Sequence, residues 1–129
     1  GRSSSSKPSW LHTDIRVRIV DKHYKDGRFY LKKARVSDVV SRGVCTLLTE
    51  DGKILEDIKD SKLETVLPKV GGMVLVLGGE LKGRKGRLMG KDKERETASV
   101  QVSGDMSMET VRMDDIAEYV GQDMDMLDY

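Results

Sequence analysis

The sequence predicts an all-β fold in which two small β-barrels follow one another and pack together, with short helical turns between some of the strands. Three observations indicate this fold class: short apolar runs bounded by turn residues, the absence of a long helical period, and an internal repeat. In the repeat, residues 63–67 fall on residues 116–120 at an offset of 53. The chain has 129 residues, which is enough for two very small domains.

Five short strands are expected in the first half of the chain. Residues 15–20 alternate apolar and basic side chains, which is the period of a strand with one buried face. The pair Asp51-Gly52 is a strong signal for a tight turn and predicts a hairpin. Residues 63–67 end at Pro68 and predict a short helical turn and a closing strand. The expected strands are residues 15–20, 34–40, 44–48, 54–58 and 63–67.

The second half repeats this order of elements. Its expected strands are residues 73–77, 87–89, 98–102, 110–113 and 115–120. The join at residues 68–72 is too short for the two barrels to move freely, and a barrel of about 50 residues lies near the lower limit of independent stability. The expected domains are residues 10–69 and 70–121. We expect residues 1–9 to be a Ser-rich disordered linker of a longer protein, and residues 122–129 to be an acidic tail.

The formal net charge of +1 hides two basic segments and one acidic segment. Residues 16–42 hold nine basic and three acidic side chains, a net charge of +6. Residues 80–95 carry a net charge of +4, and residues 96–129 carry −8. Such asymmetry is expected in a chain that contacts a polyanion.

The residue types that most enzymes and metal sites need are scarce. Cys45 is the single cysteine, and His12 and His23 are the only histidines. Neither a nucleophile-elbow motif nor a phosphate-binding loop motif is present. We therefore expect no enzymatic activity, no cofactor and no metal. No apolar run approaches the roughly 18–20 residues of a transmembrane helix, so we expect no membrane contact.

Residues 22–33 interleave cations with aromatic rings and are expected to form a long basic hairpin. Such a segment can bind single-stranded nucleic acid, because rings stack on bases while cations contact phosphates. The alternative is that the rings pack in the core or at its rim. Tyr24 and Tyr30 are the rings expected to be exposed, because tyrosine has a polar end. The candidate RNA-binding residues of this region are Lys22, Tyr24, Lys25, Arg28, Tyr30, Lys32, Lys33 and Arg35.

Other apolar side chains are expected to have structural roles. Trp10 is expected to close one end of the first barrel, with stacking on a base as the alternative. Cys45 is expected to be a small buried side chain. Met106, Met108 and Met113 are expected to provide adaptable packing, with a methionine-rich groove as the alternative.

The most specific stretch is residues 72–89, in which an apolar strand, a glycine corner and a basic turn precede a second strand. Gly79, Gly83 and Gly86 would allow positive φ in a sharp turn and leave backbone N–H groups open to phosphate oxygens. The candidate RNA-binding cations at the tip of this turn are Lys82, Arg84, Lys85 and Arg87. The alternative is a solvated hairpin tip whose charge serves solubility. The stretch resembles a KOW motif, with Gly83 at its signature glycine, and the resemblance implies two tandem SH3-like/KOW β-barrels.

The resemblance extends over residues 10–129. The segments that carry it, in order, are Trp10-Leu11, residues 15–19, residues 63–68, the KOW stretch and residues 117–121. Together they are similar to the C-terminal region of nuclear proteins that carry a G-patch and KOW motifs, and residues 121–129 are most similar to a plant member. The resemblance implies a nuclear, spliceosome-associated protein and, for plant members, microRNA-precursor processing and immunity. The G-patch that engages a DEAH-box helicase has no counterpart here, so helicase activation is not implied for this chain.

Two functional hypotheses follow. In the first, a monomeric module binds RNA mainly at phosphates through both basic segments, with weak sequence preference because cationic turns read charge rather than base edges. In the second, the module is a scaffold that docks on a spliceosomal or RNA-processing protein through barrel edges and the acidic tail. Residues 1–70 carry a net charge of +5 and residues 71–129 carry −4, so the first barrel is expected to dominate RNA affinity. The expected stronger set is Lys25, Arg28, Lys32 and Lys33, and the weaker set is Lys82, Arg84, Lys85 and Arg87.

Overall fold

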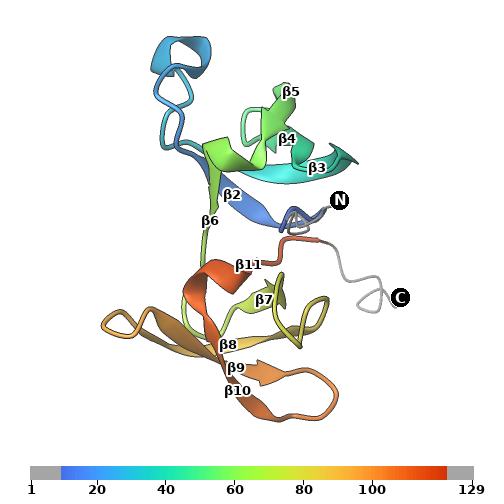
Figure 1. The fold of residues 1–129 in the computed structure, drawn as a ribbon, viewed down its shortest axis with the longest axis vertical. Coiled ribbons are helices and arrows are strands. Elements are labelled where there is room, and N and C mark those ends of the chain that lie inside the picture. Colours follow the sequence, from blue (N-terminus) through green and yellow to red (C-terminus); the bar gives the residue numbers. More distant parts are fainter. Residues whose placement is uncertain (1–9, 122–129) are drawn as a thin grey trace, which may run out of the picture.

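The computed structural model describes residues 10–121 as two five-stranded antiparallel sheets with short 3-10 helices (Figure 1). Each sheet belongs to one small barrel-like domain, and the two domains lie one above the other in the figure. The expectation of a nearly all-β fold with short helical turns is confirmed. The expected linker at residues 1–9 and acidic tail at residues 122–129 lie outside the described residues.

The first sheet has the strand order β5-β4-β3-β2-β6. Its strands are β2 (Arg16–Ile19), β3 (Lys33–Ser41), β4 (Val44–Thr49), β5 (Ile54–Lys59) and β6 (Leu63–Thr65), with the 3-10 helices η1 (Tyr24–Gly27) and η2 (Asp60–Lys62). The turn between β4 and β5 contains the expected Asp51-Gly52 pair. The N–H of Thr49 donates to the Lys53 carbonyl at 2.9 Å, and Gly52 has a φ of 91°, so the hairpin is confirmed.

The second sheet has the matching order β10-β9-β8-β7-β11. Its strands are β7 (Met73–Val76), β8 (Lys85–Asp92), β9 (Thr97–Val102), β10 (Met108–Arg112) and β11 (Ile116–Glu118), and the 3-10 helix η3 (Met113–Asp115) precedes the last of them. In both sheets a 3-10 helix leads into a three-residue strand that pairs with the first strand of the sheet. The sequence repeat at an offset of 53 marks this shared closing unit.

Alternating side chains explain most strands. In β2, Val17 and Ile19 are buried in the first core while Arg16 and Arg18 face outward. Cys45 is fully buried in β4, as expected. Burial, together with the nearby Asp60 carboxylate, raises the pKa of the Cys45 thiol to about 11. The thiol therefore stays protonated near neutral pH and acts as a small apolar side chain.

Strand β7 is apolar on both faces, and this explains how the domains pack. Val74 and Val76 belong to the second core. Leu75 and Leu77 point the other way and join the core cluster of the first domain. A strand covered on both faces reads as a continuous apolar run, as residues 73–77 do. The expectation that the two domains pack together is confirmed, and the first core cluster includes side chains of both domains.

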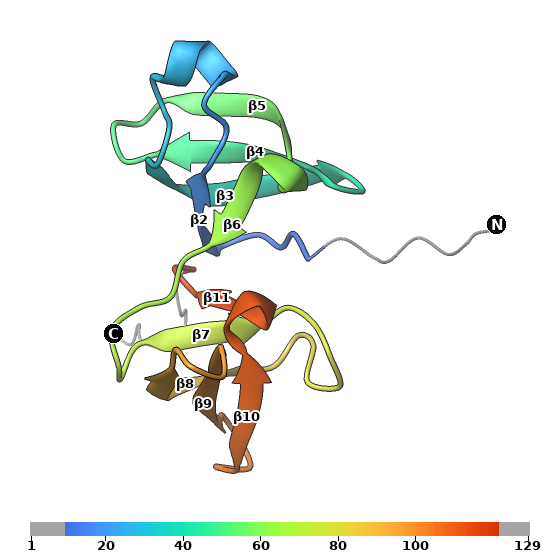
Figure 2. The same cartoon turned by 60° about the vertical axis from the view of Figure 1, so that its left-hand side comes forward.

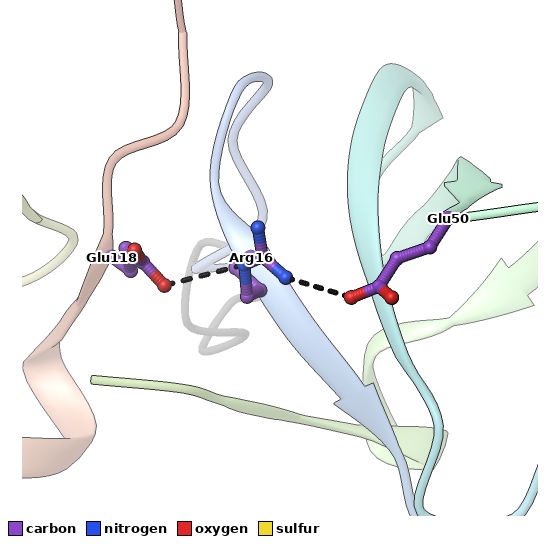
Figure 3. Close-up of polar contacts among 3 residues, drawn as sticks. All are labelled: Arg16, Glu50 and Glu118. Carbon is purple, nitrogen blue, oxygen red and sulfur yellow. Dashed lines mark hydrogen bonds and ion pairs between the residues drawn. The ribbon is translucent and has the colours of Figure 1, made fainter. Parts of the chain in front are cut away.

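Backbone hydrogen bonds and ion pairs join the domains around β11. The N–H of Glu118 donates to the Val66 carbonyl at 2.7 Å, and Ile15 forms an isolated β-bridge with Tyr119. Arg16 lies between two carboxylates, 3.2 Å from Glu50 and 3.2 Å from Glu118 (Figure 3). Arg16 therefore connects β2 both to the β4–β5 turn of its own domain and to β11 of the other.

The methionine expectation is wrong for two of three residues. Met106 is 66% exposed and Met108 is 55% exposed, whereas Met113 packs against the second core. Met106 lies in the β9–β10 turn with a φ of 57°, and Met108 begins the edge strand β10. Neither position is covered by a second layer.

In the part of the chain that the structure describes, no helix has the length and apolar character needed to cross a membrane.

Candidate nucleic-acid interface

A cavity of about 490 Å³ lies in the first domain, between the segment that follows η1 and the β4–β5 turn. Figure 2 shows these two segments on the same side of the first sheet. We call this site the basic cavity. Its lining residues are Arg28, Phe29, Leu31, Lys32 and Lys33 of the first segment and Thr49, Glu50, Asp51 and Lys53 of the second.

The expected long hairpin at residues 22–33 is wrong. The segment forms the 3-10 helix η1 and a series of turns instead of two strands. Lys25 and Asp26 have φ values of 52° and 60°, and Leu31 has a φ of 62°. Its C-terminal end is held by β2, because the N–H of Leu31 donates to the Ile19 carbonyl at 2.6 Å and the N–H of Ile19 donates to the Lys32 carbonyl at 3.0 Å. The segment is therefore a folded loop anchored on β2.

Leu31 is the most unusual residue of this loop. A bulky side chain rarely adopts a left-handed backbone, and such strain is concentrated at binding sites. The Leu31 side chain is also 50% exposed and lines the basic cavity. Together with Phe29 it gives the cavity an apolar surface in contact with solvent.

Four cations surround this apolar surface: Arg28, Lys32, Lys33 and Lys53. None of the four has a carboxylate partner among the described residues. The two acids of the cavity are Glu50, which pairs with Arg16, and Asp51, whose carboxylate has no partner in residues 10–121. Phe29 is partly buried against the first core, and its accessible part lines the cavity. Unpaired cations beside such a ring can contact phosphates while the ring and Leu31 contact a base.

The aromatic side chains of this segment were expected either to stack on bases or to pack at the core, and the structure shows where each ring lies. Tyr24 packs against the first core and its ring lies 6.2 Å from that of Phe29, centre to centre. Burial also raises the pKa of Tyr24. Tyr30 is half-buried, with the Lys22 ammonium 5.8 Å from its ring centre, and Lys25 lies at 5.8 Å from the Tyr24 ring. The expectation that Tyr24 and Tyr30 are exposed is therefore wrong, and of the three rings only Phe29 lines the basic cavity.

Arg35 lies outside the basic cavity, on the outward face of β3. It faces Arg16 across the strand pair, and Lys33 faces Arg18 in the same way. Arg18 pairs with Glu64 and Arg16 pairs with Glu50 and Glu118, so two of these four cations have acidic partners.

Arg28, Lys32 and Lys33 are the predicted RNA-binding residues that the fold brings together in the basic cavity. Sequence reasoning missed Lys53, although the Asp51-Gly52 signal fixes the turn that carries it.

The basic turn of the KOW stretch, residues 78–84 between β7 and β8, differs from expectation in two ways. Gly79 and Gly83 have φ values of 84° and 89°, as expected, but Gly86 lies within β8 and has no positive φ. The N–H groups of Lys82, Gly83 and Arg84 donate to carbonyls within the turn and β7, so they are not open to phosphate.

The four cations of the KOW stretch also do not share one tip. Lys82 and Arg84 lie in the turn, whereas Lys85 and Arg87 are on the outward face of β8. The Lys85 ammonium lies 4.3 Å from the centre of the Tyr119 ring. Figures 1 and 2 both show the KOW turn far from the η1 segment. The two basic clusters are therefore separate sites.

Gly86 is required by close packing, and its replacement by alanine is expected to destabilise the protein by about 1–3 kcal/mol. A Cβ at this position would lie 2.6 Å from the Gln101 carbonyl oxygen and 2.6 Å from Val100 Cγ1 on β9. Chemical denaturation followed by circular dichroism measures the loss. Gly90→Ala is the matched control on the same strand, because a Cβ there meets no atom within 4 Å. Equal stability of the two variants would contradict this account of Gly86.

Trp10 is half-buried against the first core. It also lines a groove of about 270 Å³ with Leu63, Glu64, Thr65 and, from the second domain, Asp114. The side chain thus covers the first core where the two domains meet.

Within residues 10–121, no group of three or more His, Cys, Asp or Glu side chains is arranged to hold a metal ion.

Comparisons with known proteins match nearly all of the described chain. Residues 15–121 match the family described as GPKOW C-terminal domain. Protein MOS2 of Arabidopsis thaliana is 45% identical over 129 residues, covering 99% of this chain and 28% of that protein. The G-patch domain and KOW motifs-containing protein of Xenopus laevis is 45% identical over 114 residues, 87% of this chain and 23% of that protein. The human protein of the same name is 39% identical over 113 residues, 87% of this chain and 24% of that protein.

Proposed function

The chain belongs to the GPKOW C-terminal domain family, and from this we propose that it is an RNA-binding module of a nuclear protein that acts in RNA processing. The resemblance to proteins with a G-patch and KOW motifs is confirmed, and a plant protein is among the relatives. The chain spans about a quarter of the length of these relatives. The activity of the full-length protein is therefore part of the proposal.

The basic cavity is the observation that supports RNA binding. It combines cations without carboxylate partners, a partly buried phenylalanine and a strained exposed leucine in one space of about 490 Å³. The cations come from two segments far apart in sequence, and the fold places them around the apolar surface of Phe29 and Leu31. A flexible single strand can place a phosphate near the cations and a base on that surface.

Affinity for single-stranded RNA is expected to fall steeply with salt. If the four cavity cations each neutralise one phosphate, the logarithm of the association constant should change with the logarithm of salt concentration with a slope of about −2.8. Fluorescence anisotropy with a labelled single-stranded RNA, repeated over a series of salt concentrations, measures this slope. A duplex RNA serves as the comparison, because its bases are not free to enter the cavity.

Absence of binding at low salt would contradict the proposal for this module. A slope near zero would show that phosphate contacts do not provide the affinity. Equal affinity for the duplex and the single strand would place the contact on charge alone and leave the apolar surface of the cavity without a role.

The biological setting is the finer part of the proposal. The family resemblance implies pre-mRNA splicing through spliceosomal or RNA-processing partners, or microRNA-precursor processing and immunity in plants. The relatives reported above are not named for an enzymatic reaction, and we propose a binding module that is monomeric and not an enzyme. Depletion of the full-length protein, followed by sequencing of unspliced transcripts and microRNA precursors, separates the two settings.

A protein-interaction scaffold is the second candidate, supported by the outer face of the second sheet. Cross-strand pairing places Met73 beside Arg87, Arg87 beside Gln101, and Gln101 beside Met108. Both methionines are exposed, and β10 is an edge strand of the sheet. A pull-down from nuclear extract with Met73→Glu and Met108→Glu variants tests this role. Loss of partners with RNA binding intact would favour the scaffold.

A further inference from the structure

We propose that the basic cavity selects guanine among the bases of single-stranded RNA, with Asp51 as the residue that recognises it. This inference rests on the proposed function, because it assigns a base preference to the same RNA-binding site. It goes beyond that function, since contacts to phosphates alone would bind all sequences equally.

Asp51 belongs to the exposed Asp-Gly turn between β4 and β5, and the fold places this turn beside the cations of the cavity. A carboxylate in a site for a polyanion repels the phosphates that the surrounding cations attract. Asp51 nevertheless lines the basic cavity together with Lys32 and Lys53. Its carboxylate has no hydrogen bond or ion pair to any described residue. It is therefore an acceptor that the protein itself does not use.

Glu50, the other acid of the cavity, is already engaged. Arg16 donates a hydrogen bond from Nη1 to the Glu50 carboxylate at 3.2 Å, and the same guanidinium lies 3.2 Å from Glu118 (Figure 3). This ion pair engages the Glu50 carboxylate and holds it toward β2. Asp51 is thus the one cavity acid among the described residues that is free to accept hydrogen bonds from a ligand.

The hydrogen-bonding edges of the bases determine which base suits a free carboxylate. Guanine presents two donors side by side, N1–H and the exocyclic N2 amino group, and one carboxylate can accept from both. Adenine and cytosine present an amino group next to an acceptor nitrogen. Uracil presents its single N3–H between two carbonyl oxygens, which a carboxylate repels. Asp51 should therefore favour guanine most and uracil least.

The remaining lining supports the same arrangement. Phe29 and Leu31 provide the apolar surface for the plane of the base. Arg28, Lys32, Lys33 and Lys53 surround that surface and can take the flanking phosphates. Leu31 has a left-handed backbone, and its side chain is half exposed at the cavity. One unstacked nucleotide can then contact the apolar surface, the cations and the Asp51 carboxylate at the same time.

The test compares two RNAs by fluorescence anisotropy at one salt concentration: an oligouridine of about nine nucleotides and the same oligomer with one central guanine. The chain is expected to bind the guanine-containing RNA about tenfold more tightly, because a charge-assisted pair of hydrogen bonds that remains partly solvated lies at the low end of its range. In Asp51→Asn the ratio should fall to about one, while affinity for oligouridine stays equal or rises as the repulsion is removed.

Two features of the design separate recognition from structure. Asn-Gly forms the same hairpin turn as Asp-Gly, so Asp51→Asn keeps the fold of the turn. Asp57→Asn is the matched control, because Asp57 is an exposed acid on β5 outside the basic cavity, at a φ of 58° that asparagine also adopts. The control should keep the guanine preference.

Each outcome decides something. A preference that is lost in Asp51→Asn and kept in Asp57→Asn supports the inference. Equal binding of the two RNAs by the unmodified chain, or a preference that survives in Asp51→Asn, overturns it while leaving RNA binding intact. Failure of both RNAs to bind overturns the proposed function and the inference with it.

Discussion

Replacing Leu75 by alanine is expected to lower the free energy of unfolding by about 2–5 kcal/mol and to destabilise both domains together. Leu75 is carried by β7 of the second sheet but is 2% exposed within the core cluster of the first domain. The cavity left by truncation would lie where the two domains meet. Urea denaturation followed by fluorescence of Trp10, the single tryptophan, reports on the first domain.

Val70→Ala is the control for this experiment, because Val70 lies just before β7 and is 59% exposed. Its effect should stay within about 0.5 kcal/mol. A Trp10 transition that is unchanged in Leu75→Ala would show that the first domain does not depend on β7. The two domains would then be independent units that only touch.

Removing the cations of the basic cavity is expected to weaken RNA binding about 30- to 700-fold, since loss of four partly solvated contacts costs about 0.5–1 kcal/mol each. The variant carries alanine at Arg28, Lys32, Lys33 and Lys53. Lys53 takes the place of Lys25 in the set expected from the sequence, because Lys53 lines the cavity and Lys25 lies over the Tyr24 ring. Anisotropy with one single-stranded RNA at one salt concentration measures the loss.

The comparison variant carries alanine at Lys82, Arg84, Lys85 and Arg87. It removes the same number of charges from the KOW stretch, so the net charge of the chain changes equally in both variants. We expect the smaller loss here, because these cations are divided between a turn and a strand face. A larger loss from this second variant would show that the KOW stretch is the main contact, and our ranking would be wrong.

Most strands could be predicted because burial imposes a period that the sequence displays. The alternation of residues 15–20 and of residues 98–102 appears directly as alternating buried and partly buried side chains in β2 and β9. The internal repeat predicts the short helical turn and the last strand of each domain, which are η2 with β6 and η3 with β11. The unbroken apolar run at residues 73–77 also indicates the interface between the domains. A strand with one solvent-exposed face would alternate apolar and polar side chains.

The basic cavity could be predicted only in part. The charge of residues 28–33 is visible in the sequence, but the left-handed backbone at Lys25 and Leu31 has no local signal, because lysine and leucine do not favour it. The contribution of Asp51 and Lys53 depends on the pairing of β3 with β4, which brings the β4–β5 turn beside the η1 segment. Such a juxtaposition is a property of the tertiary fold and not of either segment.

Gly86 shows the same limit at a single residue. A glycine in a basic, glycine-rich stretch reads as a turn residue with positive φ, and Gly79 and Gly83 follow that rule. Gly86 instead lies in β8, where the Gln101 backbone and the Val100 side chain leave no space for a Cβ. The reason for this glycine is therefore a strand that is distant in sequence.

An amide chemical-shift map of the chain titrated with a short single-stranded RNA tests the central claim most directly. The account predicts that the largest changes occur in two segments distant in sequence, residues 28–33 and 49–53, and that residues 79–87 change much less. Changes confined to residues 79–87, or changes in neither region, would contradict the assignment of RNA binding to the basic cavity.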